Sequence, residues 1–203
     1  MKSIIYFFIN SNIWVASCIL GLTFSSEILL KEANFKISFF VFFSSILAYN
    51  FQRVVSLKRG HTHCYKDWLE KNKKAIYFLM FFSAALSSYL FVDFKLSTQI
   101  AILFAGALSL FYPFGLRGIP FAKIFIISFV WVLSAMMLLV LENNIAISQN
   151  IIWQLTSLFL FVFAITIPFD IRDIDYDMKN IVTIPLFFGV RRAKIIAIFS
   201  LFI

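Results

Sequence analysis

Six stretches of this sequence contain no charged residue, and each is close to the length of a membrane-spanning helix. They cover residues 3–26, 37–52, 75–92, 96–116, 124–141 and 143–169. A helix that crosses the hydrocarbon core of a bilayer needs roughly 20 mostly apolar residues. The pattern therefore predicts an all-α, polytopic transmembrane helical bundle with six complete spans. We expect the short second stretch to continue past Arg53 through Val54 and Val55.

A seventh apolar run begins after Lys194 and contains nine uncharged residues up to Ile203. We therefore expect residues 1–203 to form a single integral membrane domain that includes the start of a seventh span, with later helices missing. The composition agrees, because 62% of the residues are hydrophobic and 14% are charged, against roughly a quarter charged in soluble domains. No secretory cleavage site follows the first stretch, so we expect that helix to be retained.

Lysine and arginine are distributed unevenly between the two sides of the predicted bundle. Fifteen of the 18 lie at the amino terminus or in the loops after the second, fourth and sixth spans, and only Lys31, Lys36 and Lys95 lie on the other side. Short cytoplasmic loops carry the excess of Lys and Arg. We therefore expect a protein of a bacterial inner membrane with its amino terminus and these loops in the cytoplasm. This sidedness accounts for the net charge of +8, so nucleic-acid binding is not expected.

Four of the ten carboxylates lie within residues 170–177, which read Asp-Ile-Arg-Asp-Ile-Asp-Tyr-Asp at the end of the sixth uncharged stretch. On one helix, Asp170, Asp173 and Asp177 would fall at i, i+3 and i+7, and their charges would repel. A divalent cation would turn that repulsion into attraction. Mg²⁺ prefers oxygen ligands and is often held by one or two carboxylates together with substrate phosphates. The segment predicts a metal-diphosphate site, since a solvated acidic turn is a poorer reading of so dense a cluster.

The residues that follow strengthen this interpretation. Residues 172–177, then Thr183-Ile184-Pro185 and the Gly-Val-Arg-Arg-Ala run at 189–193, resemble the second acidic motif of the UbiA superfamily of intramembrane prenyltransferases. Tyr112-Pro113-Phe114 followed by Arg117 resembles the Tyr-plus-basic loop of that family. One residue fewer separates Asp177 from Thr183 than is usual there. The resemblance implies a nine-helix, all-α fold, of which this chain would be an amino-terminal portion.

The resemblance also implies an activity. Members of the family transfer an isoprenoid from a prenyl diphosphate to a lipophilic acceptor, most often an aromatic ring. By similarity, Asp173 and Asp177 would be the catalytic residues that hold Mg²⁺ against the diphosphate, with Asp170 on the same stripe as a further metal ligand. Arg172 and Lys179 would pair with phosphate oxygens, although basic residues at this place also serve as topology signals. Tyr112 and Arg117 would contact the substrate, although a tyrosine here also anchors a helix at the interface.

The first acidic motif of the family is degenerate in this chain. Its Asn is present as Asn50, but Val54 and Lys58 stand where the two acidic residues are expected. Asn50 would bind substrate or hydrogen-bond a neighbouring helix, a role that polar residues in spans often have. We expect Arg53 and Lys58, with Arg59, to replace part of the missing metal charge, because fixed cations neutralise phosphates directly.

Other readings stay open from the sequence. The degenerate motif favours a non-catalytic relative that binds isoprenoid diphosphate or a partner protein. A transporter is less favoured, because charges within the spans are almost absent. His61, His63 and Cys64 are zinc ligands by type, yet no second ligand pair lies near them, and a lid over the site is the simpler interpretation of that loop. The 28 phenylalanines would line a carbocation cavity or simply face lipid.

Overall fold

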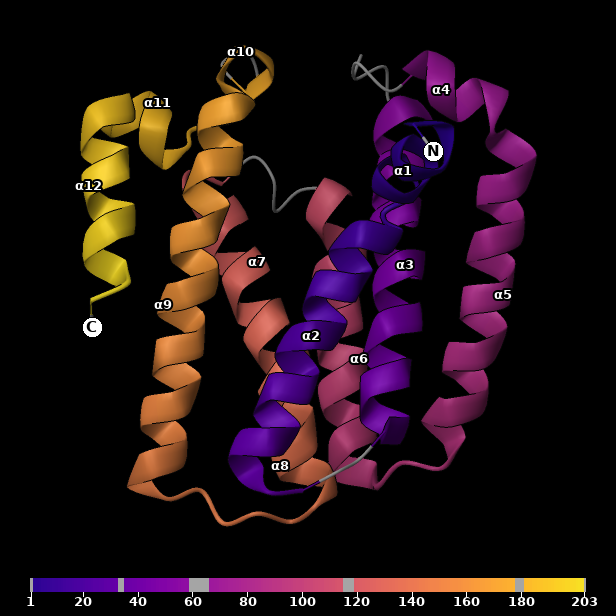
Figure 1. The fold of residues 1–203 in the computed structure, drawn as a ribbon, viewed down its shortest axis with the longest axis vertical. Helices are drawn as coiled ribbons and strands as arrows, with labels where there is room; N and C mark the ends of the chain where they lie inside the picture. The colour runs from indigo at the N-terminus through magenta and orange to yellow at the C-terminus, as the bar shows by residue number, and fades with distance from the viewer. Residues whose placement is uncertain (1, 33–34, 59–65, 115–118, 178–180, 203) are drawn as a thin grey trace. The chain divides into compact units, whose positions relative to one another are not determined.

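The computed structural model describes residues 2–32, 35–58, 66–114, 119–177 and 181–202, and every regular element in these ranges is a helix (Figure 1). A helix satisfies its backbone hydrogen bonds within one segment, which is what an apolar run in lipid requires. The all-α fold class predicted from the sequence is therefore confirmed.

Five described helical segments are long and apolar enough to cross a membrane. They are α2 (Ile13–Leu30), α3 (Phe35–Lys58), α5 (Lys73–Val92), the run Ala122–Glu142 and α9 (Gln149–Arg172). A further apolar helix, α6 (Leu96–Phe111), has 16 residues and continues into the 3-10 turn η1 (Tyr112–Phe114). Large apolar side chains stay exposed on these helices; Phe81 of α5, for example, is 75% exposed. The chain is a helical membrane protein, and the count of six spans stays a prediction.

The first uncharged stretch does not form one helix as the sequence predicts. It breaks into α1 (Lys2–Asn10) and α2, and the residue before α2 is Asn12 in the left-handed conformation, with φ 61°. Asparagine tolerates this conformation better than other residues that carry a side chain. The membrane-length helix therefore begins ten residues later than the uncharged stretch and ends at Leu30, so that Glu27 lies within it.

The run Ala122–Glu142 is divided by a π-helical segment. It consists of α7 (Ala122–Val132), the π-helical η3 (Leu133–Met137) and α8 (Leu138–Glu142). A π-helical turn carries more residues per turn than an α-helix. It therefore changes which side chains face the neighbouring helices, and Ala135 and Met136 within it are buried.

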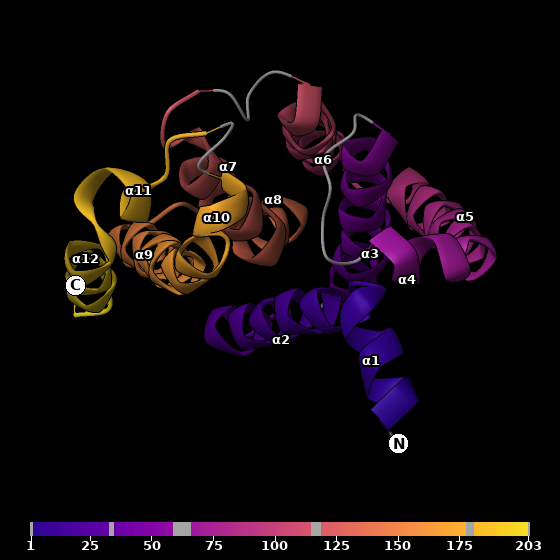
Figure 2. The ribbon, with the colours of Figure 1, turned by 90° about the horizontal axis from the view of Figure 1, so that it is seen from above.

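The chain forms two compact units, each described here by itself. The amino-terminal unit comprises residues 1–106 and 134–144, and the carboxyl-terminal unit comprises residues 107–133 and 145–203. In the amino-terminal unit, α3 packs between α2 and α5 (Figure 2). The apolar side chains buried in these three helices include Ala16, Ile19, Ile37, Val41, Ile46 and Ile76. Close contact between helices in lipid depends on such packing, because lipid gives no hydrophobic drive for helices to associate.

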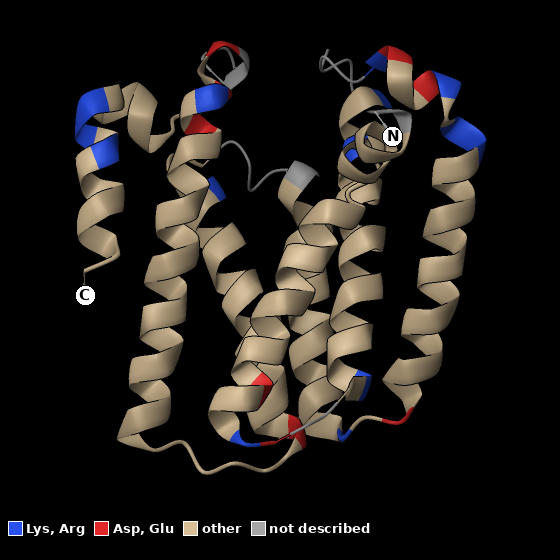
Figure 3. Cartoon of the chain, in the orientation of Figure 1, with Lys and Arg blue, Asp and Glu red and all other residues tan. Residues whose placement is uncertain are grey.

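Charged residues of the amino-terminal unit gather at or near the helix ends (Figure 3). Lys36 Nζ lies 2.9 Å from Asp93 Oδ2, joining the start of α3 to the end of α5. Lys95 donates through Nζ to the carbonyl of Glu142 at 2.5 Å, and its backbone N–H donates to Glu142 Oε2 at 3.1 Å. The uncharged middle of each helix therefore corresponds to the expected depth of the bilayer core.

In the carboxyl-terminal unit, α9 packs against α7 and α12 (Val190–Ser200), with the short helices α10 (Ile174–Asp177) and α11 (Ile184–Phe188) between the ends of α9 and α12. One apolar cluster joins four of these helices; its buried members are Ile124, Phe163, Ile167, Ile184 and Ala193. Gly189 separates α11 from α12 with φ 80°, a conformation that residues with a side chain rarely adopt.

Candidate functional site

The acidic segment lies where α9 ends. Asp173 caps the helix with φ −95° and ψ 11°, its backbone N–H donates to the carbonyl of Phe169 at 3.0 Å, and α10 begins at the next residue. The three aspartates that the sequence places on one continuous helical stripe are therefore divided between two helices and the turn that joins them. The helix is therefore interrupted at Asp173, within the stretch where the carboxylates were expected to align.

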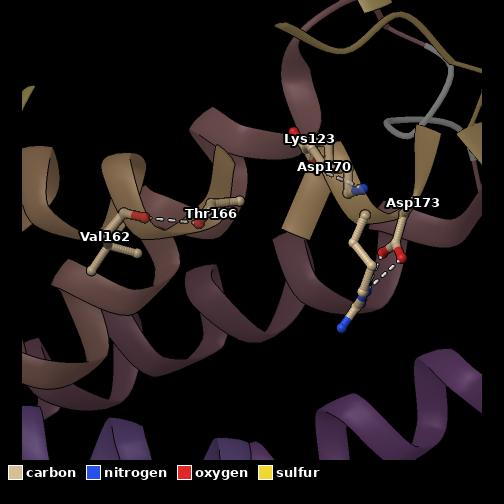
Figure 4. Close-up of polar contacts among 6 residues, drawn as sticks. Lys123, Val162, Thr166, Asp170 and Asp173 are labelled. Carbon is tan, nitrogen blue, oxygen red and sulfur yellow. Dashed lines mark hydrogen bonds and ion pairs between the residues drawn. The ribbon is translucent and has the colours of Figure 1, made fainter. Parts of the chain in front are cut away.

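Asp170 forms a buried ion pair with Lys123. Lys123 Nζ lies 2.8 Å from Asp170 Oδ1 (Figure 4), and the side chains are 17% and 1% exposed. A buried carboxylate is costly without a counter-charge. Lys123, at the start of α7, supplies that charge, whereas the sequence analysis counted it only as a topology signal. Asp170 therefore fits the role of a residue that positions α9 against α7 better than the predicted role of a metal ligand.

Further contacts tie the start of α7 to the α11 region, and another lies within α9. Phe121, which precedes α7, donates its backbone N–H to the carbonyl of Val182 at 2.9 Å and packs its ring edge-to-face on that of Phe187. One turn before Asp170, the Thr166 hydroxyl donates to the carbonyl of Val162 at 2.8 Å. The segment that follows the acidic residues is therefore anchored to the start of α7.

Asp173 pairs with the side chain next to it. Arg172 Nε lies 2.8 Å from Asp173 Oδ1, and Arg172 also donates to Asp173 Oδ2 at 3.0 Å. The guanidinium lies 5.2 Å from the centre of the Phe169 ring. Both side chains of the pair are partly exposed, at 57% and 30%, and exposed pairs contribute little to stability. The carboxylate of Asp173 is therefore reachable by a ligand, and Arg172 already stands beside any phosphate that would bind there.

The described residues fit a magnesium site only in part. Within the described ranges, no group of three or more His, Cys, Asp or Glu gathers as metal ligands. Mg²⁺ needs fewer protein ligands than that, because substrate phosphates and water complete its shell. Asp173 suits such a site, while Asp175 is exposed and Asp170 is engaged by Lys123. The side chain of Asp177 and all of Lys179 lie outside the described residues, so their predicted roles stay predictions.

Asn50 and Arg53 meet the break between α1 and α2 inside the amino-terminal unit. Asn50 Nδ2 donates to the carbonyls of Ser11 and Ile46, each at 2.8 Å, and Asn50 Oδ1 accepts from Asn12 Nδ2 at 3.1 Å. Arg53 donates to the carbonyl of Asn10 and to Asn12 Oδ1, the latter at 2.9 Å. Asn50 is completely buried. Of the two roles that the sequence left open for Asn50, the geometry favours the structural one.

The remaining predicted site residues are placed as follows. Lys58, at the end of α3, lines a pocket together with residues of α4 (Lys66–Lys71) and α5. Tyr112 is half-buried in η1 of the carboxyl-terminal unit. Arg117 lies outside the described residues, as do His61, His63 and Cys64. The Tyr-plus-basic loop and the histidine-containing loop therefore stay predictions.

Comparison of the chain with protein-family models, with curated proteins and with solved structures finds no match in any of the three.

Proposed function

We propose that this chain is an intramembrane prenyltransferase of the UbiA type, which moves an isoprenoid group from a prenyl diphosphate to a lipophilic, aromatic acceptor. One observation carries the proposal: Asp173, with Arg172 beside it, is partly exposed at the end of the apolar helix α9, while the neighbouring Asp170 is separately neutralised by Lys123. An acid and a base at the end of a membrane span suit a ligand with a charged head and an apolar tail. The Thr-Ile-Pro and Gly-Val-Arg-Arg-Ala runs support the family assignment.

The part of the chain that follows Asp173 contains groups that suit a diphosphate as the charged group. Thr183 precedes α11 in extended conformation, and Pro185 lies in the first turn of that helix. Arg191 and Arg192 are exposed in the first turn of α12. Arginine presents a planar set of donors that matches phosphate oxygens. The residues that resemble the family's second motif thus lie at the starts of α11 and α12, and two of them are arginines.

The proposed reaction breaks the bond between the allylic carbon and the diphosphate oxygen, and the electron pair leaves with the diphosphate. A ring carbon of the acceptor then bonds to the allylic carbon, and the ring loses a proton to water or to a basic group. Mg²⁺, when bound, would stabilise the charge of the departing diphosphate. Asp173 and Asp177 would hold the metal, Arg172 would bind phosphate oxygens, and the apolar helices would keep water away from the cation.

A second candidate is a non-catalytic protein of the same type that binds a prenyl diphosphate. The contacts of Asn50 and Arg53 favour it, because both residues are engaged at the α1–α2 break, and Val54 and Lys58 replace the acidic residues of the family's first motif. Such a protein would bind the donor without releasing diphosphate. The two candidates therefore differ in turnover.

The test is release of diphosphate from geranylgeranyl diphosphate in membranes that carry the protein, with Mg²⁺ and an aromatic acceptor. Replacing both Asp173 and Asp177 by Asn should lower the rate by at least about 100-fold, as expected when groups that stabilise developing charge are removed. Asp175→Asn is the matched control, because Asp175 is exposed in the same segment; its rate should stay near that of the wild type. Donor binding without release by any of the proteins would select the non-catalytic candidate.

We further propose that the protein lies in a bacterial inner membrane with the acidic segment on the cytoplasmic side. The distribution of Lys and Arg supports the cytoplasmic orientation, since the loops rich in Lys and Arg are short and close to span ends.

A further inference from the structure

A pocket of about 200 Å³ lies within the amino-terminal unit, where α3, α4 and α5 meet. Its apolar lining consists of Val54, Leu57, Leu69, Ile76 and Tyr77, and its charged lining consists of Lys58, Lys66, Glu70 and Lys73. Leu69 and Ile76 are 7% and 1% exposed, whereas the three lysines are exposed. The pocket therefore has an apolar floor and a basic rim.

The rim lies at the ends of two membrane-length helices. Lys58 is the last residue of α3 and Lys73 is the first residue of α5. The short helix α4 links this region to α1, since the Trp68 ring lies 6.5 Å from that of Tyr6 and 5.7 Å from that of Phe7. Tyrosine and tryptophan concentrate at membrane–water interfaces. The pocket thus lies at the ends of these helices, where the headgroups of a bilayer are expected.

The net positive charge of the rim favours an anionic ligand. Three lysines face a single carboxylate, and no ion pair joins any of the three to a carboxylate in the part of the chain that the structure describes. Lys73 Nζ lies 5.9 Å from the centre of the Tyr77 ring, which is about one turn further along α5. Lysine binds phosphate as a flexible, strongly charged donor. A pocket of this volume is smaller than a typical site for a drug-sized ligand, so it suits a headgroup rather than a whole lipid.

We propose that this pocket binds the phosphate headgroup of a membrane amphiphile, with the lysines on the phosphate and the first carbons of the apolar chain on Leu69 and Ile76. The same chemistry belongs to a prenyl diphosphate and to an anionic phospholipid. The proposal concerns binding alone and does not require the acidic segment or any turnover. It also assigns Lys58 to a pocket that it lines together with residues of α4 and α5, which the sequence did not predict.

The test is binding of radiolabelled geranylgeranyl diphosphate to the purified protein in phosphatidylcholine nanodiscs. Chelator is present and acceptor is absent, so a metal site and catalysis do not contribute. Lys58→Gln/Lys73→Gln should weaken binding roughly 30-fold, because each lysine near a membrane surface contributes a factor of about five. Lys71→Gln/Lys74→Gln is the matched control, since it removes the same charge from exposed residues that do not line the pocket; it should weaken binding less than about threefold, because solvent ions screen exposed charges.

Competition distinguishes the two sources of phosphate. Displacement by phosphatidylglycerol placed in the discs would identify a site open to bilayer phospholipids, and its absence would identify a site selective for prenyl diphosphate; both support the proposal. Equal weakening in the two double variants would overturn it, because the effect would then be one of surface charge. Geranylgeraniol binding as tightly as its diphosphate, or inorganic diphosphate doing so, would also overturn it. Failure here leaves the proposed transfer reaction standing, since that reaction is read from diphosphate release at Asp173.

Discussion

Replacing Lys123 by methionine should lower the free energy of unfolding by about 3 to 5 kcal/mol, the usual cost of breaking a buried ion pair from one side. The attraction between unit charges 2.8 Å apart is about 6 kcal/mol at an effective dielectric constant of 20. Much of that attraction offsets the removal of both groups from water. Without Lys123, the Asp170 carboxylate, which is 1% exposed, loses the attraction and keeps its desolvation cost.

Replacing Asp170 rather than Lys123 should lower the free energy of unfolding by a smaller amount. Asp170→Asn leaves Lys123, whose side chain is 17% exposed, and a lysine can extend its ammonium group toward water. We expect a loss of about 1 to 2 kcal/mol. The double variant Lys123→Met/Asp170→Asn should therefore be more stable than the sum of the single losses implies, with a coupling energy of about 2 to 3 kcal/mol.

The assay is unfolding of the purified protein by sodium dodecyl sulfate in mixed micelles, followed by circular dichroism. Lys36→Met/Asp93→Asn provides a matched cycle, because that ion pair is joined at 2.9 Å but its side chains are 60% and 54% exposed. Exposed pairs contribute little, so no coupling should be measurable there. The reasoning is refuted if the two cycles give the same coupling energy, or if Lys123 and Asp170 behave additively.

Three further predictions concern other parts of the chain. Asn50→Leu should destabilise the protein by about 2 to 3 kcal/mol in the same unfolding assay, because it removes two hydrogen bonds at the α1–α2 break and one within α3; an unchanged stability would contradict this. Gly189→Ala should cost about 1 to 3 kcal/mol, because Gly189 has φ 80° and ψ 155°, which only glycine adopts readily; a stability equal to wild type would show that the turn relaxes. A cysteine at Lys74 should react with a membrane-impermeant thiol reagent from the cytoplasmic side and one at Lys95 from the opposite side; labelling of both from one side would contradict the proposed topology.

The helical fold could be predicted from the long uncharged stretches of the sequence. Long uncharged stretches in a chain that is 62% hydrophobic have no stable alternative to helices in lipid. The break at Asn12 could not be placed in this way. Residues Ser11 and Asn12 carry no charge, so the first stretch reads as continuous, and the break depends on Arg53 and Asn50, which lie about forty positions later in the chain.

The same limit applies to the candidate site. The acidic residues were found because four carboxylates in eight positions stand out beside an apolar run. The residues that pair with these carboxylates could not be found from the sequence. Helices that are apolar all round give no periodic pattern to show which face packs against which neighbouring helix. The pairing of Lys123 with Asp170 depends on how α7 packs against α9. A lone lysine directly before the uncharged stretch 124–141, at the same predicted end as an aspartate, was the one signal available.

Formation of the prenylated acceptor tests the central proposal most directly. The measurement is a single turnover with isotope-labelled geranylgeranyl diphosphate, Mg²⁺ and an aromatic acceptor, followed by mass spectrometry of the lipid extract. We expect the labelled product from the wild type and from Asp175→Asn, with one diphosphate released for each product, and none from Asp173→Asn. Product formed equally by Asp173→Asn, or bound donor that never yields product with any acceptor, would contradict a transferase that works through the acidic segment.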